Sequence, residues 1–234
     1  MRSTALRALV FVGAAAFGAA EVTAQQAATP PFEAGKHYAV LTPPQPTSTD
    51  PGKVEVAEIF MFGCPGCFGF EPYIEAWAEQ KPDYINFVRI PAQWSSHPES
   101  PMHARAYYTA EALGKLGEIE RSFFDEVHMK GNLLDTEEKL ATFFAAHGVD
   151  AATFKSTFNS FAVNAKLKRA DELVGRYRVQ STPSVVVNGK YLTVGRMAGS
   201  VEAWFAIIDE LAAREHAAAS GSPSSAIISR KQKQ

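Results

Sequence analysis

The sequence predicts an α/β fold in which strands near both ends of the chain enclose an all-helical insertion. Strand-like apolar runs occur at 54–61 and 84–90, and again at 184–194. From residue 98 to about 160, apolar residues instead recur at helical spacing. The third observation is a Cys-x-x-Cys motif, from Cys64 to Cys67, placed where the first strand ends and a helix begins.

Cys64 and Cys67 are the two cysteines of the chain. We expect Cys64 at or just before the helix N-terminus, where unpaired N–H groups and the helix dipole favour a thiolate. Pro65 suits the first helical turn, because its missing N–H would have no partner there. Cys67 follows one turn later, close enough to form a disulfide with Cys64. This layout predicts a thioredoxin-like redox site.

The same two thiolates could instead bind a metal, as half of a zinc site or as soft ligands for Cu(I). Zinc would need two more ligands, but the chain has no third cysteine and its six histidines show no paired spacing. The five methionines are scattered. We therefore predict no metal and no other cofactor, and keep a thiolate metal-binding module as the alternative from another functional class.

The 234 residues carry a net charge of −2, which gives no indication of a nucleic-acid partner. Residues 1–24 read as a secretory signal peptide. Arg2 and Arg7 precede the apolar run Ala8 to Ala20, and Val22-Thr23-Ala24 places small residues at a cleavage site. The run is shorter than the ~20 residues of a membrane span. The chain is thus predicted to be exported.

Export changes the meaning of the cysteines. Exported proteins commonly use disulfides to stabilise the fold. A link between Cys64 and Cys67 would close so short a loop that it would constrain little of the unfolded chain. The pair is better explained by working redox chemistry.

The first part of the chain supplies one half of the sheet. Residues 25–52 are an N-terminal segment and loop, with a short edge strand at 37–41. Residues 53–97 hold a central strand, a helix at 68–80 and a strand at 84–90. Two acidic residues interrupt the central strand: we expect Glu55 to face solvent near its start, and Glu58 lies in its middle.

The insertion at 98–160 is predicted to hold four helices, at 102–113, 116–129, 135–146 and 150–159. Asp135 or Thr136 caps the third and Asp150 caps the fourth. Residues 161–214 form the second half: a helix at 161–177, strands at 184–188 and 190–194, and a closing helix at 200–214. Asn188-Gly189 predicts a hairpin between the two strands. We predict a disordered tail at 215–234.

Four stretches, in order, resemble the DsbA-type periplasmic thiol:disulfide oxidoreductases, a family with a thioredoxin fold and an inserted helical domain. The resemblance covers roughly residues 33–214. The C-P-x-C motif, with the T-P-x-x-x-V-N-G-K-Y that follows it downstream, is specific, whereas the helical insertion alone would not be. The stretches are Glu33 to Tyr38, Glu58 to Glu71, Thr157 to Phe161, and Thr182 to Tyr191.

The resemblance implies roles for individual residues. Cys64 matches the partly exposed nucleophile and Cys67 the buried resolving cysteine. Pro183 matches a cis-proline that faces the disulfide, and Thr182 before it would present its backbone to a substrate chain. Glu58 and Glu71 match acidic residues near the buried cysteine, where a carboxylate can exchange a proton with it.

Two positions depart from the strongly oxidising members of the family. Those members have His where this chain has Gly66, and Val where it has Thr182. Glycine gives the Cys64 thiolate neither charge nor a side-chain hydrogen bond, so we expect a smaller depression of the Cys64 pKa and a less oxidising disulfide. Thr182 is more similar to isomerases and thioredoxin-like relatives.

The predicted function is a monomeric periplasmic oxidoreductase that introduces disulfides into exported proteins. The implied partners are folding exported proteins with free thiols and a quinone-linked membrane reoxidase of the DsbB type. We expect an apolar, weakly specific substrate surface around Phe62, Phe68 and the Thr182-Pro183 loop. A reductase or isomerase of the same fold is the alternative within enzymes, although the chain has no room for an isomerase's usual dimerisation domain.

Overall fold

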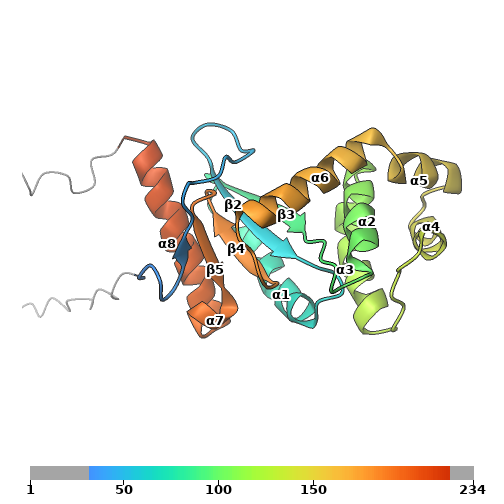
Figure 1. Cartoon of the computed structure of the whole chain (residues 1–234), viewed down its shortest axis with the longest axis horizontal. Coiled ribbons are helices and arrows are strands. Elements are labelled where there is room, and N and C mark those ends of the chain that lie inside the picture. Colours follow the sequence, from blue (N-terminus) through green and yellow to red (C-terminus); the bar gives the residue numbers. More distant parts are fainter. Residues whose placement is uncertain (1–31, 222–234) are drawn as a thin grey trace, which may run out of the picture. The chain divides into compact units, whose positions relative to one another are not determined.

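The computed structural model describes residues 32–221, and these confirm an α/β fold with a helical insertion (Figure 1). The mixed sheet has the order β1-β5-β4-β2-β3, in which only β2 and β3 run parallel. Its strands are β1 (Ala39–Val40), β2 (Val54–Phe60), β3 (Ile85–Pro91), β4 (Ser184–Val187) and β5 (Tyr191–Val194). The helices are α1 (Pro65–Gln80), α2 (Ser100–Ala112), α3 (Leu116–His128), α4 (Glu137–Ala146), α5 (Ala151–Phe158), α6 (Phe161–Arg176), α7 (Gly195–Ala198) and α8 (Val201–Ala219).

Strand β2 lies inside the sheet and is buried along its whole length, as its apolar run predicts. The expectation for Glu55 is wrong, because this side chain is buried. The Ser48 backbone N–H and hydroxyl donate to Glu55 Oε2 over 2.9 and 3.1 Å. The loop before β2 therefore replaces the water that this carboxylate would otherwise require.

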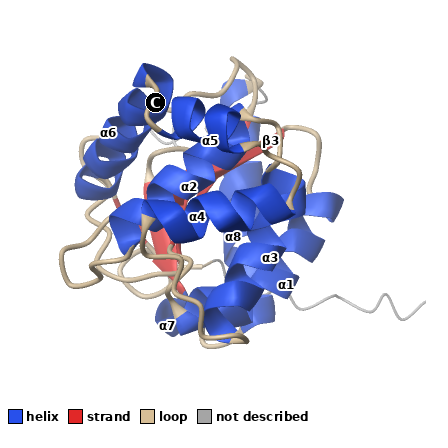
Figure 2. Cartoon of the chain, turned by 90° about the vertical axis from the view of Figure 1, so that its right-hand side faces the viewer, coloured by secondary structure: helices blue, strands red, loops and turns tan. Residues whose placement is uncertain are grey.

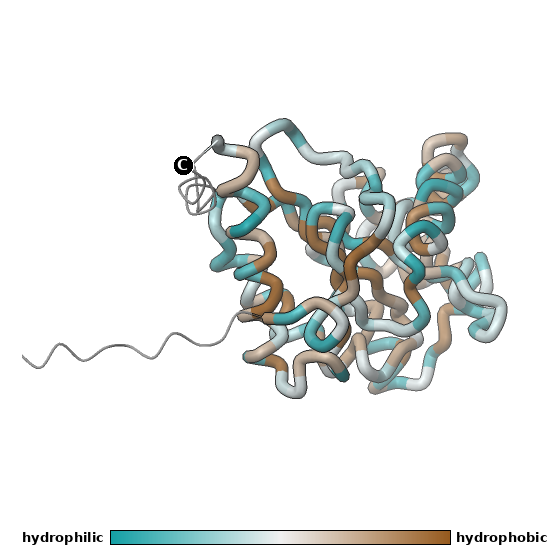
Figure 3. The backbone as a smooth tube through the Cα atoms, turned by 60° about the vertical axis from the view of Figure 1, so that its left-hand side comes forward, coloured by the Kyte–Doolittle hydropathy of each residue, from teal (hydrophilic) through white to brown (hydrophobic). Residues whose placement is uncertain are grey.

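Two hydrophobic cores cover the two faces of the sheet. Figure 2 shows α2 and α4 in front of the strands, and in Figure 3 the hydrophobic segments of the backbone, in brown, lie mostly in the interior of the fold. Helices α1 and α8 cover one face, where Phe70 stacks on Trp204 with ring centroids 4.6 Å apart. The other face meets the larger core, to which α2 through α6 contribute. Fully burying a large apolar side chain such as Ile208 contributes about 1.5–3 kcal/mol. These two cores hold the end of β2 and the start of α1 in a fixed relation.

Local capping fixes the helices between β3 and β4. The Thr136 hydroxyl accepts from the Lys139 N–H, and the Asp150 carboxylate accepts from the N–H groups of Ala152 and Thr153. Thr136, rather than Asp135, is therefore the cap of α4. The exact domain boundaries, at 53, 97 and 160, stay predictions.

The hairpin between β4 and β5 turns at Asn188-Gly189 as predicted, with both residues at positive φ. The loop before β2 passes so close that any side chain at Gly189 would collide with the Gln45 carbonyl. Glycine is required here for space as well as for conformation.

The predicted start of the tail at 215 is wrong, because α8 continues to Ala219. Glu215 is buried and anchors the hairpin, accepting from Asn188 Nδ2 (2.7 Å), the Tyr191 hydroxyl (3.0 Å) and Lys190 Nζ. His216 stacks on Tyr84 with centroids 4.1 Å apart. These tertiary contacts extend a helix whose last turns show little apolar pattern.

The predicted signal peptide, and residues 222–234 of the predicted tail, lie outside the described residues. Within residues 32–221, no helix has the length and apolarity to cross a membrane.

Candidate redox site at the start of helix α1

Cys64 is the N-cap of α1. This helix begins after β2 and a short turn (Figure 1). Its backbone is extended, and its sulfur accepts from the Cys67 N–H over 3.4 Å. Pro65 occupies the first turn, as the sequence predicts. A sulfur at this position receives the free N–H groups of the helix and faces the positive end of its dipole.

These contacts favour the thiolate of Cys64. Its pKa falls from 9.0 to about 5. The largest cause is a hydrogen bond from the Cys67 thiol. Hydrogen bonds from the backbone N–H groups of Cys67 and Gly66 lower the pKa less, and partial burial raises it. The depression arises without any side chain at position 66.

We expect the alkylation of reduced Cys64 by iodoacetamide to rise through a midpoint near pH 5 and to be level above about pH 6. The reason is that only the thiolate reacts, and the pKa of Cys64 is about 5. Mass spectrometry of the labelled peptide over pH 3.5–9 measures this, with free cysteine as the reference thiol. A midpoint near pH 8 to 9 would show that the helix terminus does not act on this sulfur.

Cys67 has the opposite environment. It is fully buried, and burial together with the neighbouring Cys64 raises the pKa of its thiol well above the usual range. In the structure both cysteines are thiols rather than a disulfide. The pair therefore combines one accessible sulfur that favours the anion with one buried sulfur that favours its proton.

The Thr182-Pro183 peptide lies against Cys64, and its bond is cis. The Cys64 sulfur is 3.4 Å from the Thr182 carbonyl oxygen, a contact that joins residues 118 positions apart. A Cβ added to Gly66 would lie 3.3 Å from Pro183 Cδ and 3.6 Å from the Cys64 sulfur. Glycine thus leaves a slot between the cysteine motif and the proline loop. This slot continues into an apolar cavity of about 310 Å³ over Phe70 and Trp204.

The structure brings Glu58 and Glu71 together through Arg89, a residue that the sequence analysis did not single out. Glu58 on β2 is directly opposite Arg89 on β3. Glu58 Oε2 lies 2.8 Å from Arg89 Nε, and Glu71 receives two hydrogen bonds from the same guanidinium over 2.8 and 2.6 Å. A third carboxylate, Glu120 on α3, is 3.1 Å from Arg89 Nη1. The available signal was an acidic residue within one apolar strand, Glu58, and a basic residue, Arg89, within the next.

One predicted surface residue is misplaced. Phe62 is buried and stacks on Phe123 with centroids 4.1 Å apart, so it cannot contact a substrate. Phe68 is half-buried and stacks on His128, 4.7 Å away and nearly parallel. His128, also not anticipated, lies 2.7 Å from the Phe62 carbonyl oxygen through Nε2. The surface beside the cysteines is therefore formed by Phe68 and His128 rather than by Phe62.

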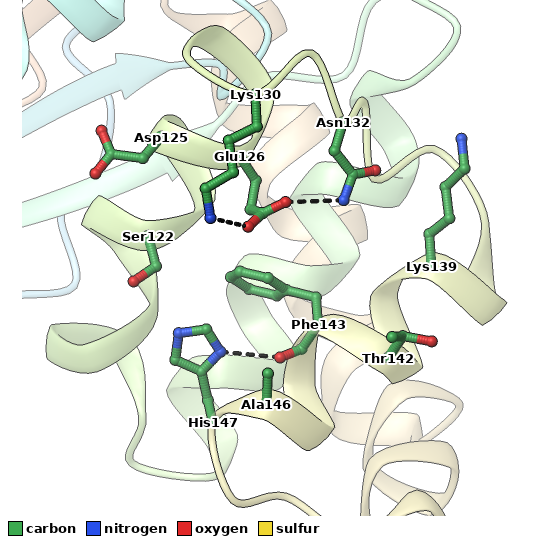
Figure 4. A pocket seen from close by; sticks show the side chains of 10 residues that line it. All are labelled: Ser122, Asp125, Glu126, Lys130, Asn132, Lys139, Thr142, Phe143, Ala146 and His147. Carbon is green, nitrogen blue, oxygen red and sulfur yellow. Dashed lines mark hydrogen bonds and ion pairs between the residues drawn. The ribbon is translucent and has the colours of Figure 1, made fainter.

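A larger cavity of about 500 Å³ lies between α3 and α4 (Figure 4). Its polar side chains largely satisfy one another: Glu126 pairs with Lys130 (2.6 Å) and Asn132 (2.9 Å), and His147 Nδ1 with the Phe143 carbonyl oxygen (2.9 Å). It has no cysteine, and no lining residue comes from α1 or the Thr182-Pro183 loop. Among the described residues, no three His, Cys, Asp or Glu side chains form a group suited to a metal. The cysteine pair is therefore the candidate reactive site.

Comparison with known proteins agrees with this geometry. The family described as "DSBA-like thioredoxin domain" matches residues 74–203, which include the Thr182-Pro183 loop but not the cysteines. The "Thiol:disulfide interchange protein DsbA" of Pseudomonas aeruginosa is 39% identical over 188 residues, covering 80% of this chain and 88% of that protein. Its namesake in Pseudomonas syringae is 36% identical, covering 89% and 94%.

Solved structures show the same relationship. The crystal structure of Pseudomonas aeruginosa DsbA superposes with a TM-score of 0.76 at 39% identity, covering 81% of this chain and 97% of that one. That of the DsbA oxidoreductase from Xylella fastidiosa gives 0.73 at 31% identity, covering 80% and 98%. With the family match, the relatives and the superposed structures in agreement, this chain belongs to the DsbA-like thioredoxin-domain family.

Proposed function

We propose that this protein is a thiol:disulfide oxidoreductase that introduces disulfide bonds into exported proteins through Cys64 and Cys67. The observation that carries the proposal is the contrast between the two sulfurs. Cys64, at the helix N-terminus, has a pKa of about 5, whereas Cys67 is buried and keeps its proton. Membership of the DsbA-like family supports the same activity.

The first step opens the enzyme's disulfide. A substrate thiolate attacks Cys64 Sγ, the only one of the two sulfurs with access to solvent. The Cys64–Cys67 bond breaks, its electron pair passes to Cys67, and that sulfur takes up a proton. The substrate is now joined to Cys64 by a mixed disulfide. The buried position and high pKa of Cys67 suit it to end this step as a thiol.

The second step releases oxidised substrate. A second substrate thiolate attacks the substrate sulfur of the mixed disulfide, and Cys64 leaves with the electron pair as a thiolate. A thiol of low pKa is a good leaving group, so this environment speeds the release. The substrate has lost two electrons and the enzyme has gained them.

The Thr182-Pro183 loop is proposed to hold the substrate. Its position beside Cys64 lets an extended peptide run next to Thr182 and pair with its backbone, which requires little side-chain specificity. Pro65 and Gly66 shape the rim of the site, and Gly66 leaves it open toward the apolar cavity. Glu58 and Glu71 are proposed to tune Cys67, since the charge of Glu58 raises the pKa of that thiol.

We place the protein in the periplasm, as a monomer that acts on folding exported proteins with free thiols. The two electrons gained in each cycle must leave, so we also propose a quinone-linked membrane reoxidase of the DsbB type as its partner. The periplasmic assignment rests on the predicted signal peptide and on the family. The partners rest on the family alone.

The redox equilibrium of the Cys64–Cys67 pair in a glutathione buffer series tests this function. We expect mildly reducing mixtures to open the disulfide, because the Cys64 thiolate stabilises the dithiol form. The same protein should oxidise a reduced, unfolded protein with free thiols. A disulfide that persists until strongly reducing conditions would contradict the proposal and would favour a reductase, the direction that Gly66 and Thr182 suggest.

A further inference from the structure

Arg89 lies at the centre of three carboxylates that come from three different elements. Glu58 belongs to β2, Glu71 to α1, and Glu120 to α3 in the helical insertion. The Arg89 side chain is 7% exposed and those of Glu58 and Glu71 are fully buried, whereas that of Glu120 is 18% exposed. A single guanidinium thus pairs with three carboxylates, two of them fully buried and the third partly exposed.

The guanidinium shares its hydrogen bonds unequally. Glu71 accepts two, and Glu120 accepts one from Nη1 over 3.1 Å. Glu58 Oε2 forms an ion pair with Nε over 2.8 Å, but neither Glu58 oxygen has a hydrogen bond of good geometry. Glu58 is therefore the least satisfied of the three, and the one that most resists ionisation.

The charges of the cluster do not balance. With every group ionised it would carry three negative charges against one positive charge, which burial strongly disfavours. Burial raises the pKa of Glu58 to about 7 and that of Glu120 to about 6, with Arg89 opposing both shifts. Other ionisable groups also act on the cluster. The charge of Glu75 on α1 raises the pKa of Glu120 further, and Tyr107 on α2 interacts with the charges of Glu120 and Arg89. Cys67 interacts with the charge of Glu58.

Glu120 also marks the solvent side of the cluster. It lines a surface cavity of about 380 Å³ with Arg89, Glu75 and Glu79, whereas Glu58 lies on the inner side toward Cys67. The group on α3 is therefore the one that solvent and substitutions can reach without opening the core.

We propose that Glu120 is a positioning residue for the redox reaction: by sharing Arg89 with Glu58 and adding a negative charge to the buried cluster, it favours the protonated, uncharged form of Glu58 beside Cys67. This proposal rests on the proposed function and deepens it. When a substrate thiolate attacks Cys64, the electron pair of the broken S–S bond passes to Cys67. A neutral Glu58 does not repel that charge, whereas an ionised one does. The helical insertion thus acts on the cysteine pair through Arg89.

The test replaces Glu120 by glutamine, whose amide oxygen can still accept from Arg89 but carries no charge. The control is Glu118→Gln, an exposed residue on the same helix that pairs with Lys115. In oxidised protein labelled with carbon-13 in its glutamate carboxyls, we expect Glu58 of E120Q to titrate about one pH unit lower than in wild type or E118Q.

A kinetic arm uses the same three proteins. The rate of disulfide opening by dithiothreitol, divided by the thiolate concentration, should fall through the Glu58 midpoint, and E120Q should show this fall at lower pH. Identical Glu58 titrations in E120Q and E118Q would overturn the inference. If the wild-type disulfide were inert to thiols, the proposed function would fail instead, and the Glu58 titration would still decide the role of Glu120.

Discussion

Replacing Cys64 by serine is expected to abolish disulfide transfer, with a loss of at least about a thousandfold in the rate of substrate oxidation. The accessible sulfur that substrates attack is gone, and the buried Cys67 cannot replace it because its pKa is high and its exposure is nil. Oxidation of a reduced unfolded protein, followed by its free-thiol content, measures the loss.

The matched variant is Cys67→Ser. It keeps the Cys64 nucleophile but removes the thiol that resolves mixed disulfides, so incubation with oxidised glutathione should collect a glutathione adduct on Cys64 that mass spectrometry detects. If the two variants lost activity alike and neither collected an adduct, the division of roles between the two sulfurs would be wrong. Equal activity of Cys64→Ser and wild type would show that Cys64 does not carry the redox reaction.

Replacing Arg89 by methionine is expected to lower the free energy of unfolding by about 3–5 kcal/mol, because Glu58 and Glu71 would remain buried without their cation. Chemical denaturation at pH 7 measures this. The control is Arg121→Met on α3. Arg121 is 52% exposed and pairs with Asp125 over 3.3 Å, so its loss should cost less than about 1 kcal/mol.

The loss of unfolding free energy in R89M should be smaller at acidic pH. Arg89 lowers the pKa values of Glu58 and Glu120, which burial raises to about 7 and about 6, so without the guanidinium these values lie further above those of the unfolded chain. A carboxyl with a raised pKa favours the folded state below its unfolded pKa, and this advantage is lost as the pH rises through the folded value. The difference between R89M and wild type should therefore be smallest near pH 4.5 and grow toward pH 7. A defect independent of pH would point to lost packing of Arg89 on Phe60, whose ring centre is 4.3 Å away.

The sequence predicted those parts of the fold and site that depend on neighbours along the chain. The order strand, Cys64-Pro65-Gly66-Cys67, helix specifies an N-cap sulfur by local geometry alone. Asn188-Gly189 likewise specifies a hairpin through two residues that tolerate positive φ. The position of Pro183 beside the disulfide is predicted only through the family resemblance, since nothing in its own surroundings marks the contact.

The parts that were missed depend on register and on tertiary burial. The partner of Glu58 follows from β2 and β3 pairing in parallel with Glu58 opposite Arg89, a register that no single segment encodes. Phe62 looked like a surface aromatic beside the cysteines, but α3 brings Phe123 and Phe124 over it. The last turns of α8 are fixed by Glu215 on the hairpin, a contact between segments that sequence patterns do not connect.

The contact between Cys64 and Thr182 has a consequence for how the protein is made. During synthesis the chain emerges from its N-terminus, so β2, α1 and β3 are present long before β4. The second edge of β2 has no partner until then, and closing so long a loop is a slow, late event in folding. An unfinished chain carries both cysteines without the loop that faces them. Competence for thiol exchange with a bound peptide is thus acquired only when the polypeptide is nearly complete.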